Sequence, residues 1–323
     1  MPKHQQQRRR GRGRARLLLL LVFACITAAA TYACVIRPPT RPAQKEHVGP
    51  VALPTPVEAP RTARKPDFYT ILISGVDDGN GGSDTNILMA MDAKNSAIHC
   101  VSIPRDTKAM VDGRAHKINF AYNHGGSSLM AQTVSQQLGV PVDFTVSVDL
   151  QGFRALVDAI DGVDFDIPID MNYDDPLQDL SIHFSKGRRH LNGQEALEVV
   201  RFRENNDGTG YGTQDLGRMA TQQNFLKTVA KQTLQPGNLS KISEFSNLFQ
   251  TYVTTDLTLG NLAWMGGEAM KMGAEHITFS TLPGEWKAPY IYLDGEAVLT
   301  LVNQSLNPYT TPRIATDLDI LTP

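Results

Sequence analysis

Cysteine is scarce in this chain, which has only three among 323 residues. Two of them, Cys25 and Cys34, fall in an apolar segment near the N-terminus, so Cys100 stands alone in the remainder. This distribution excludes a disulfide within the remainder, and a domain of this kind must rely on its hydrophobic core. Cys100 lies between Ile98 and Val101 in an apolar run, a setting typical of a buried strand residue without a catalytic role.

Several common catalytic motifs are also absent. The chain contains no Walker phosphate-binding loop, no HExxH zinc motif and no nucleophile elbow. The histidines of the globular part show no spacing typical of metal ligands. Any catalytic chemistry must therefore be carried by other residue types, and arginine and aspartate form the clearest patterns.

The N-terminus combines a basic tail with an apolar run. Residues 1–16 carry seven Lys and Arg and no acid, and residues 17–36 contain no charged residue. Twenty such residues can cross a bilayer as a helix, and the basic flank is expected to stay in the cytoplasm. We therefore predict a single-pass anchor in the cell membrane, with the rest of the chain outside. A cleaved signal peptide is the rival interpretation, but the run is long for one and Ala30–Cys34 is a poor cleavage site. A lipoprotein is disfavoured because the residues before Cys34 lack the usual aliphatic residue.

Positive charge is scarce once the basic tail is set aside. The chain has 31 basic and 33 acidic residues, so without the seven in the tail 24 basic residues face 33 acidic ones, a balance of about −9. A protein that binds nucleic acid without sequence preference is basic, so we expect no nucleic-acid partner. Any arginine cluster must then form a local positive pocket in an acidic body.

The chain divides into five segments. Residues 37–66 hold eight prolines and predict an extended, semi-rigid extracellular linker. Strands and helices then alternate over about 240 residues, which predicts a single α/β domain. The expected organisation is a basic cytoplasmic tail, a transmembrane anchor, the linker, the globular domain and a loose C-terminal tail, at residues 1–16, 17–36, 37–66, 67–307 and 308–323.

Apolar patterning predicts the principal elements of the domain. Phe68–Val76 is a near-continuous apolar run, typical of a central buried strand. Val199–Phe202 is predicted to be a short strand that follows a helix capped by Asn192. The other expected strands are 86–91, 98–103, 144–148, 163–169 and 277–282, and the other expected helices are 127–138, 150–160, 215–234, 239–252 and 259–272.

Two aspartates flank a glycine-rich turn. Asp77 follows the first predicted strand directly, and Asp84 comes just before the second. Ligands gather beyond the carboxyl ends of strands in open α/β sheets, and glycines let the backbone approach them closely. Two carboxylates that converge there could hold Mg²⁺, with water and phosphate oxygens completing its shell. An ordinary surface turn is the alternative, because Asp and Gly are common in turns.

Arginines lie in or after two of the predicted strands. Arg105 follows the strand that ends at residue 103, whereas Arg201 and Arg203 lie in and next to the short strand. A guanidinium group is planar and permanently charged, and it binds phosphate oxygens in pairs. Arg201 and Arg203 would share one face of a strand, where two like charges repel unless an anion lies between them. Lys117 is a further candidate cation. The alternatives are a surface ion pair with Asp106 and a solvated sheet edge.

The longest predicted helix changes character along one face. Asp215, Arg218 and Gln222 are spaced by three and four residues, and the same stripe continues with Leu226 and Val229. Such a face would open into a polar cavity at one end and pack on the core at the other. A helix N-terminus also attracts anions. Arginines, carboxylates and a metal ion together predict a pocket for a pyrophosphate group.

At these residues the chain resembles the LytR-CpsA-Psr family of bacterial cell-envelope enzymes. The matching motifs occur in order across roughly residues 68–307, which argues against chance similarity. They are Gly75–Asp77, Ser83–Thr85, Ser102–Thr107, Lys117–Asn119, Ala121–Tyr122, Gly125–Gly126, Asp149–Phe153, Asp161–Val163, Leu191–Leu197, Val200–Arg203, Asp215–Arg218, Gln222–Gln223 and Leu282–Glu285. The family usually has an arginine just before the Ser-Asp-Thr motif, and here Gly82 stands at that position.

This resemblance implies a phosphotransferase. Such an enzyme moves an anionic glycopolymer, teichoic-acid-like or capsular, from a polyprenyl-pyrophosphate carrier in the membrane lipid to a peptidoglycan hydroxyl. The implied fold is one α-β-α layered domain with a mixed central sheet and an apolar tunnel for the lipid chain. Family likeness also implies that Asp77 and Asp84 hold Mg²⁺. The implied pyrophosphate-binding residues are Arg105, Lys117, Arg201, Arg203, Arg218 and Gln222, and the implied catalytic residues are Asp77, Asp84, Arg105 and Arg218.

Two other functions would use the same residues. Water in place of the sugar hydroxyl would make the protein a polyprenyl-pyrophosphate hydrolase. A non-catalytic sensor of lipid pyrophosphate is the third possibility, although a sixteen-residue cytoplasmic tail is too small to be a signalling domain. The sequence also leaves open which of Asp77, Asp84 and Asp215 would act as the base in a transfer reaction.

Overall fold

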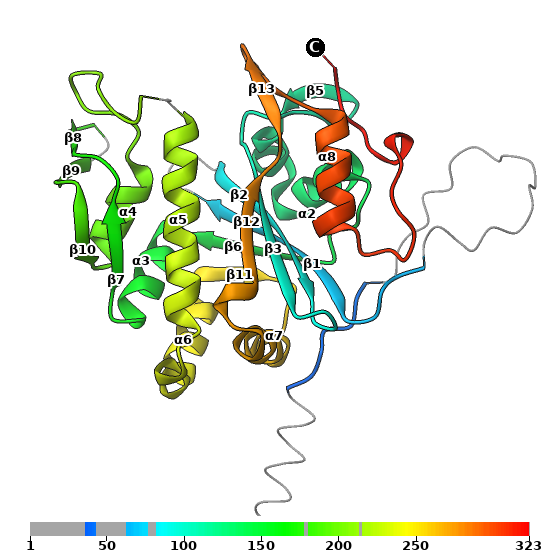
Figure 1. Cartoon of the computed structure of the whole chain (residues 1–323), viewed down its shortest axis with the longest axis horizontal. Coiled ribbons are helices and arrows are strands. Elements are labelled where there is room, and N and C mark those ends of the chain that lie inside the picture. Colours follow the sequence, from blue (N-terminus) through cyan, green and yellow to red (C-terminus); the bar gives the residue numbers. More distant parts are fainter. Residues whose placement is uncertain (1–35, 43–62, 77–81, 178–179, 213–214, 323) are drawn as a thin grey trace, which may run out of the picture.

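The centre of the molecule is a six-stranded mixed sheet in the order β11–β6–β1–β2–β3–β12 (Figure 1). The computed structural model describes residues 36–42, 63–76, 82–177, 180–212 and 215–322. β1 (Phe68–Val76) pairs antiparallel with β2 (Ser83–Asp92) and parallel with β6 (Phe144–Asp149), so the predicted mixed sheet is confirmed. The remaining strands of this sheet are β3 (Ala97–Ile103), β11 (Val253–Thr255) and β12 (Ile277–Thr281).

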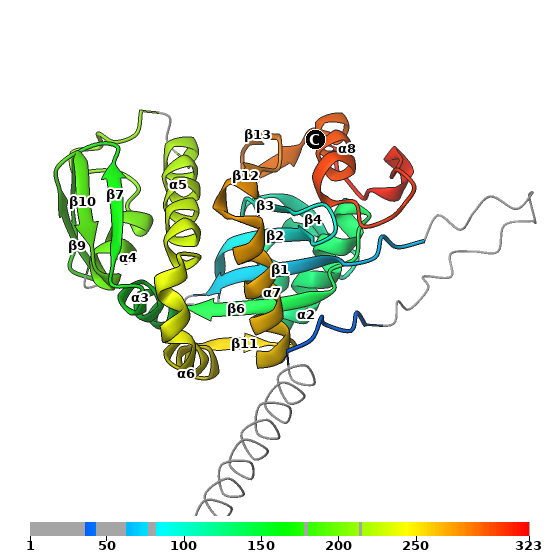
Figure 2. The same cartoon turned by 60° about the horizontal axis from the view of Figure 1, so that its bottom comes forward.

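Helices cover both faces of the sheet, as Figure 2 shows. On one face Leu72 belongs to a core with α2 (Asn119–Leu138) and α8 (Gly295–Leu301). On the other face its neighbour Ile71 belongs to a core with α5 (Asp215–Thr233) and α7 (Leu259–Met272). Successive side chains of a strand point to opposite faces, which explains why the apolar run of β1 supplies both cores.

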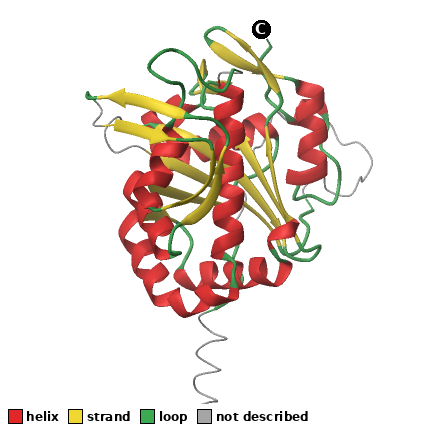
Figure 3. Ribbon diagram, turned by 60° about the vertical axis from the view of Figure 1, so that its left-hand side comes forward, coloured by secondary structure: helices red, strands yellow, loops and turns green. Residues whose placement is uncertain are grey.

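A third core lies beside the sheet. It contains Phe165, Phe202 and Phe225, all of them buried. α5 carries Phe225 in this core and Leu226 in the core under the sheet, so one helix packs on both (Figure 3). The other elements of this lobe are α3 (Leu150–Ala159), α4 (Gly193–Arg201), β7 (Val163–Ile167), β8 (Met171–Asp175), β9 (Leu180–Phe184), β10 (Gly187–Leu191) and α6 (Ile242–Tyr252).

The strand predicted at Val199–Phe202 is wrong, because α4 continues to Arg201. A capping box starts this helix: the Asn192 side chain accepts from the backbone of Glu195, and Glu195 accepts in return. Val199 is then buried in the third core at helical spacing from Ala196. Burial on this face outweighs the preference of valine for strands.

Smaller features also differ from the sequence-based expectations. α2 begins at Asn119 and not at Ser127, with a break at Gly125–Gly126, where Gly126 has a φ of 62° that favours glycine. Three hairpins were not predicted: β4 (Lys108–Val111) with β5 (Arg114–Lys117), β8 with β9, and β13 (Gly284–Lys287) with β14 (Tyr290–Leu293). Their strands have only four or five residues each, which gives apolar alternation too few positions to be recognised. β10, β11 and α8 were not predicted either.

The chain segments before and after the domain meet at one corner. Arg64 forms a bridge with Tyr309, and the Lys65 amide donates to the Pro308 carbonyl at 2.8 Å. Tyr309 is buried, so the C-terminal residues, expected to form a loose tail, pack on the domain. The Arg64 guanidinium also binds both carboxylate oxygens of Asp143, at 2.7 and 3.0 Å.

The predicted membrane anchor at residues 17–36 lies outside the described residues, except for Ile36. Within the part of the chain that the structure describes, no helix is both long and apolar enough to span a bilayer. The anchor therefore remains a prediction from the sequence.

The pair Arg64–Asp143 generates a stability prediction. Asp143 is 3% exposed and also accepts from the amide and hydroxyl of Thr70, both at 3.0 Å. Asp143→Ala would leave a guanidinium and a buried amide without their acceptor, so we expect a loss of about 3 kcal/mol in the free energy of unfolding. Urea unfolding measures this loss. Glu268→Gln, which breaks an exposed pair with Lys271, is the control and should cost under about 0.5 kcal/mol; an equal effect of the two would contradict the prediction.

Candidate active site

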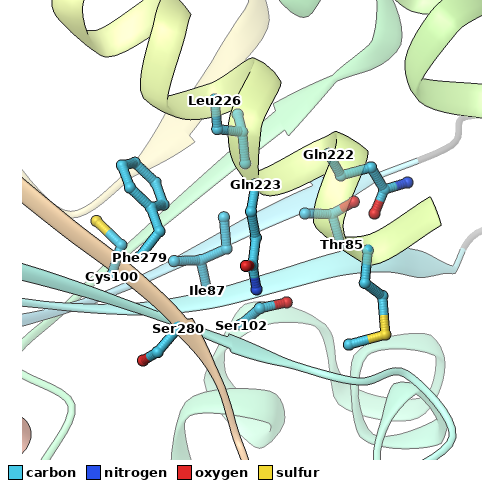
Figure 4. A pocket seen from close by; sticks show the side chains of 10 residues that line it. Thr85, Ile87, Cys100, Ser102, Gln222, Gln223, Leu226, Phe279 and Ser280 are labelled. Atoms are coloured by element: carbon cyan, nitrogen blue, oxygen red, sulfur yellow. The ribbon is translucent and has the colours of Figure 1, made fainter. Parts of the chain in front are cut away.

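A pocket lies between α5 and the central sheet (Figure 4). Strand residues on the α5-facing side of the sheet form its floor, and the segment Met219–Leu226 of α5 forms its roof. The lining residues are Thr85, Ile87, Cys100, Ser102, Met219, Gln222, Gln223, Leu226, Phe279 and Ser280.

The two ends of this pocket differ in polarity. Leu226, Phe279 and Cys100 gather at one end, whereas Thr85 and Gln222 lie at the other (Figure 4). The predicted stripe on α5 explains the difference, since Gln222 belongs to its polar part and Leu226 to its apolar part. Burial raises the pKa of the Cys100 thiol to about 12, so the thiol stays protonated and acts as an apolar lining group.

An ion-pair chain begins next to the polar end. Arg105 Nη1 lies 2.7 Å from Asp84 Oδ1, and its Nε lies 3.8 Å from Asp106 Oδ2. Asp106 in turn binds Lys117 Nζ at 2.7 Å through its other oxygen. The sequence had suggested an ion pair between Arg105 and Asp106 as the alternative. That pair is present, but its distance is longer than the distance between Arg105 and Asp84. Asp84 immediately precedes Thr85 on β2, so the backbone of this strand connects the chain of charges to the polar end of the pocket, although neighbouring side chains of a strand point to opposite faces.

Local structure fixes these charged side chains. β2 starts with Ser83, which pairs with Val76 at the end of β1, and this pairing sets the position of Asp84. β3 ends at Ile103 before a proline, which cannot continue the ladder. The Arg105 carbonyl then accepts from the Asn119 amide at 3.3 Å, at the start of α2.

The end of α4 brings two more arginines to α5. Gln222 Nε2 donates to the Val200 carbonyl at 2.9 Å, which ties the last turn of α4 to the roof of the pocket. Phe202 is fully buried and anchors the chain between Arg201, which is half-buried, and Arg203, which is exposed. The strand on which the two arginines were expected to share one face is absent, because α4 continues to Arg201, and their common role stays a prediction.

Arg218 lies one turn before Gln222 on α5 and close to Tyr211. Burial raises the pKa of the Tyr211 phenol, while a hydrogen bond with Thr221 and the positive charge of Arg218 act to lower it. The Tyr211 ring also packs edge-on against Phe202, with 5.7 Å between ring centroids. Tyr211 thus links Arg218 to the segment that carries the other two arginines.

Asp77 and the side chain of Asp215 lie outside the part of the chain that the structure describes. Of the two predicted metal ligands, the structure describes Asp84, whose side chain is 63% exposed. A carboxylate with room for water is the kind of ligand that Mg²⁺ uses. Among the described residues no group of three or more His, Cys, Asp or Glu side chains could hold a metal ion.

Sequence reasoning missed three contributors. Tyr211 and Asp106 connect the predicted residues, and Thr85 lines the pocket. Thr85 was the easiest to find, because it alternates with Ile87 on the strand that follows Asp84. Tyr211 lies in the loop between α4 and α5, where no periodic pattern marks it as a neighbour of Arg218.

Comparison with known proteins places this geometry in a family. A model described as LytR_cpsA_psr family matches residues 41–313. TagU of Bacillus subtilis (strain 168), named polyisoprenyl-teichoic acid–peptidoglycan teichoic acid transferase, is 33% identical over 253 residues, which are 75% of this chain and 78% of that protein. TagV of the same strain, whose name gives the same activity, is 32% identical over 201 residues, or 59% of this chain and 50% of that protein.

A solved structure agrees with these sequence matches. The crystal structure of B. subtilis TagV superimposes with a TM-score of 0.63 at 27% identity, and the match covers 73% of this chain and 95% of that one. The matched segment of the family model includes both sides of the pocket and every arginine described above. The chain belongs to the LytR_cpsA_psr family.

Proposed function

We propose that this protein transfers an anionic glycopolymer, teichoic-acid-like or capsular, from a polyprenyl-pyrophosphate carrier to peptidoglycan. The observation that carries the proposal is the ion pair Arg105–Asp84, which lies one residue along β2 from Thr85 at the polar end of a pocket whose other end is apolar. An amphiphile with a doubly phosphorylated head fits such a gradient. The name of the B. subtilis relative, a transferase of teichoic acid to peptidoglycan, supports the same reaction.

The donor would bind with its lipid chain toward Leu226 and Phe279 and its pyrophosphate toward Arg105. Lys117, Arg201, Arg203, Arg218 and Gln222 would complete the anion site. Guanidinium groups suit this task because each can bind two phosphate oxygens at once. These positively charged side chains would repel one another if they gathered at one site, and a bound pyrophosphate would relieve that repulsion.

In the proposed reaction the acceptor hydroxyl oxygen attacks the phosphorus that bears the glycopolymer. A new phosphorus–oxygen bond forms, the bond to the bridging oxygen breaks, and polyprenyl phosphate leaves with the electron pair. The arginines stabilise the charge that develops on the phosphate oxygens, so positioning and electrostatics do most of the catalysis. A carboxylate takes the hydroxyl proton, and Asp77, Asp84 and Asp215 are the candidates.

A bound Mg²⁺ would supply further neutralisation of the pyrophosphate charge. Asp84 would hold it together with Asp77, whose part in the site rests on the sequence alone. Gly82 stands where the family usually has an arginine, so one cation of the family site would have to come from elsewhere in this chain. We also propose that residues 17–36 anchor the protein in the cell membrane and that the domain works outside the cytoplasm, where peptidoglycan lies.

The reaction can be tested with a labelled lipid-linked polymer, with and without peptidoglycan. We expect the full chain to attach label to peptidoglycan, and Arg105→Ala to reduce the rate about 100-fold or more. Arg105→Lys should recover only part of the loss, because an ammonium lacks the planar fork. Arg188→Ala is the control, since Arg188 is 80% exposed on β10 and pairs with Asp164 there.

Each alternative function has its own outcome in this assay. Label found only as free polymer, whether or not peptidoglycan is present, would make the protein a hydrolase and reject the transferase. Tight binding of the lipid pyrophosphate without any turnover would favour a sensor.

Metal dependence gives a separate prediction. We expect chelation by EDTA to abolish transfer and added Mg²⁺ to restore it. Asp84→Asn should weaken Mg²⁺ binding at least tenfold, because an amide is a poorer ligand than a carboxylate. Calorimetric titration with Mg²⁺ measures the binding directly, and Asp170→Asn on the far lobe serves as the control. Unchanged Mg²⁺ affinity in Asp84→Asn would remove this aspartate from the metal site without touching the transferase proposal.

The pocket itself can be probed through Cys100. In a full chain with Cys25→Ser and Cys34→Ser, Cys100 is the sole thiol. Because its pKa is raised to about 12, the thiol is almost wholly protonated at pH 8, and N-ethylmaleimide should label it at least 100-fold more slowly than in guanidinium. The labelling rate should climb up to about pH 11.

Ligands can then be tested for protection of Cys100 at pH 10. Polyprenyl pyrophosphate should slow labelling and inorganic pyrophosphate should not. Equal labelling rates with both ligands would place the lipid chain elsewhere.

A further inference from the structure

Trp286, on β13, is unusual among the described side chains. It is 56% exposed to solvent. Among the large apolar residues in the described part of the chain, only Leu177 has a larger exposed fraction. A tryptophan that presents a flat ring to solvent is a frequent anchor for a binding partner. Its surroundings decide which partner that is.

Backbone contacts hold Trp286 close to the proposed active site. Trp286 pairs with Ile291 across the β13–β14 hairpin. The Ile291 amide in turn donates to the Asp106 carbonyl at 2.9 Å, and Ile291 forms a bridge with Thr107. One strand therefore separates Trp286 from the segment that carries Arg105.

A side-chain contact makes the same connection. Lys117 Nζ lies 5.9 Å from the centroid of the Trp286 ring and 2.7 Å from Asp106 Oδ1. Lys117 thus joins the ring to the ion-pair chain that reaches Asp84 through Arg105. Since the ring remains half-exposed, it stays open to a ligand beside a lysine that can donate hydrogen bonds.

We propose that Trp286 and Lys117 form the subsite for the acceptor glycan, the neutral sugar chain of peptidoglycan. This inference rests on the proposed transferase function and adds where the acceptor binds. A half-exposed aromatic ring with an ammonium donor 5.9 Å from its centroid matches a sugar, which has an apolar C–H face and hydroxyl groups around it.

Charge and geometry favour the acceptor over the anionic donor polymer. Both neighbours of Trp286 on β13, Glu285 and Lys287, pair with each other at 3.4 Å. β13 therefore adds no net positive charge beside the ring to attract a polyanion. In-line displacement also requires the acceptor to approach opposite the leaving polyprenyl phosphate. The leaving group would lie in the pocket under α5, whereas the hairpin borders Arg105 through Asp106 and Thr107.

A binding experiment tests the subsite without any turnover. The chain has two tryptophans, so in the full chain with Trp264→Phe all tryptophan fluorescence comes from Trp286. Titration with an N-acetylglucosamine tetrasaccharide, a neutral probe of the glycan backbone, should give a saturable spectral change. In the otherwise unaltered chain, Trp286→Ala should weaken calorimetric binding of this probe roughly tenfold, the typical share of one aromatic anchor. Trp286→Tyr should restore most of it, and Leu259→Ala, another exposed apolar residue, should have no effect.

A kinetic experiment separates acceptor from donor. With peptidoglycan varied, Trp286→Ala should raise the acceptor KM about tenfold and leave the donor KM unchanged. A raised donor KM with an unchanged acceptor KM would assign the ring to the polymer and overturn the proposal, as would tetrasaccharide binding that is insensitive to Trp286→Ala. If the unaltered chain binds the tetrasaccharide through Trp286 but transfers nothing, the transferase fails and the glycan site stands.

Discussion

The packing of α5 on two cores is the constraint on which the site depends. Phe225 fixes the helix to the lobe that contains α4, while Leu226 fixes it over the sheet. Because α5 packs on both cores, the distance of its first turns from β2 and β3 is fixed. The pocket is the space between these turns and the two strands. The same arrangement ties the end of α4 to α5 through the hydrogen bond from Gln222 to the Val200 carbonyl, above a sheet whose strands come from a distant part of the sequence.

The fold was predictable where burial alone decides it. The apolar run of β1 and the 3.6-residue stripe of α5 gave nearly correct bounds, because core packing and local preference agree there. The error at Val199–Phe202 arose where they disagree: two valines favour a strand, yet the capping box at Asn192 and the core against α5 keep the segment helical. The roles of Arg201 and Arg203 did not depend on this error, since Phe202 is buried between them in either conformation.

The site was predictable as a set of residues and less so as a geometry. Charged motifs identified Arg105, Asp84 and Lys117, but their order along one ion-pair chain depends on Asp106, which the sequence presented only as a competing partner. Trp286 was not predicted at all. Its hairpin has strands of four residues, and its nearness to Lys117 depends on backbone pairing between Ile291 and Asp106. Contacts between segments this far apart leave no periodic trace in a single sequence.

The corner where Arg64 meets Tyr309 has a mechanical consequence. Since the polypeptide enters and leaves the domain side by side, tension between its two ends would act across the short contacts of Lys65 with Pro308 and Arg64 with Asp143. The six-stranded sheet would carry almost none of that force. A force applied to the two ends of this domain would therefore leave the strands of the sheet, and the arginine side chains positioned by them, in place.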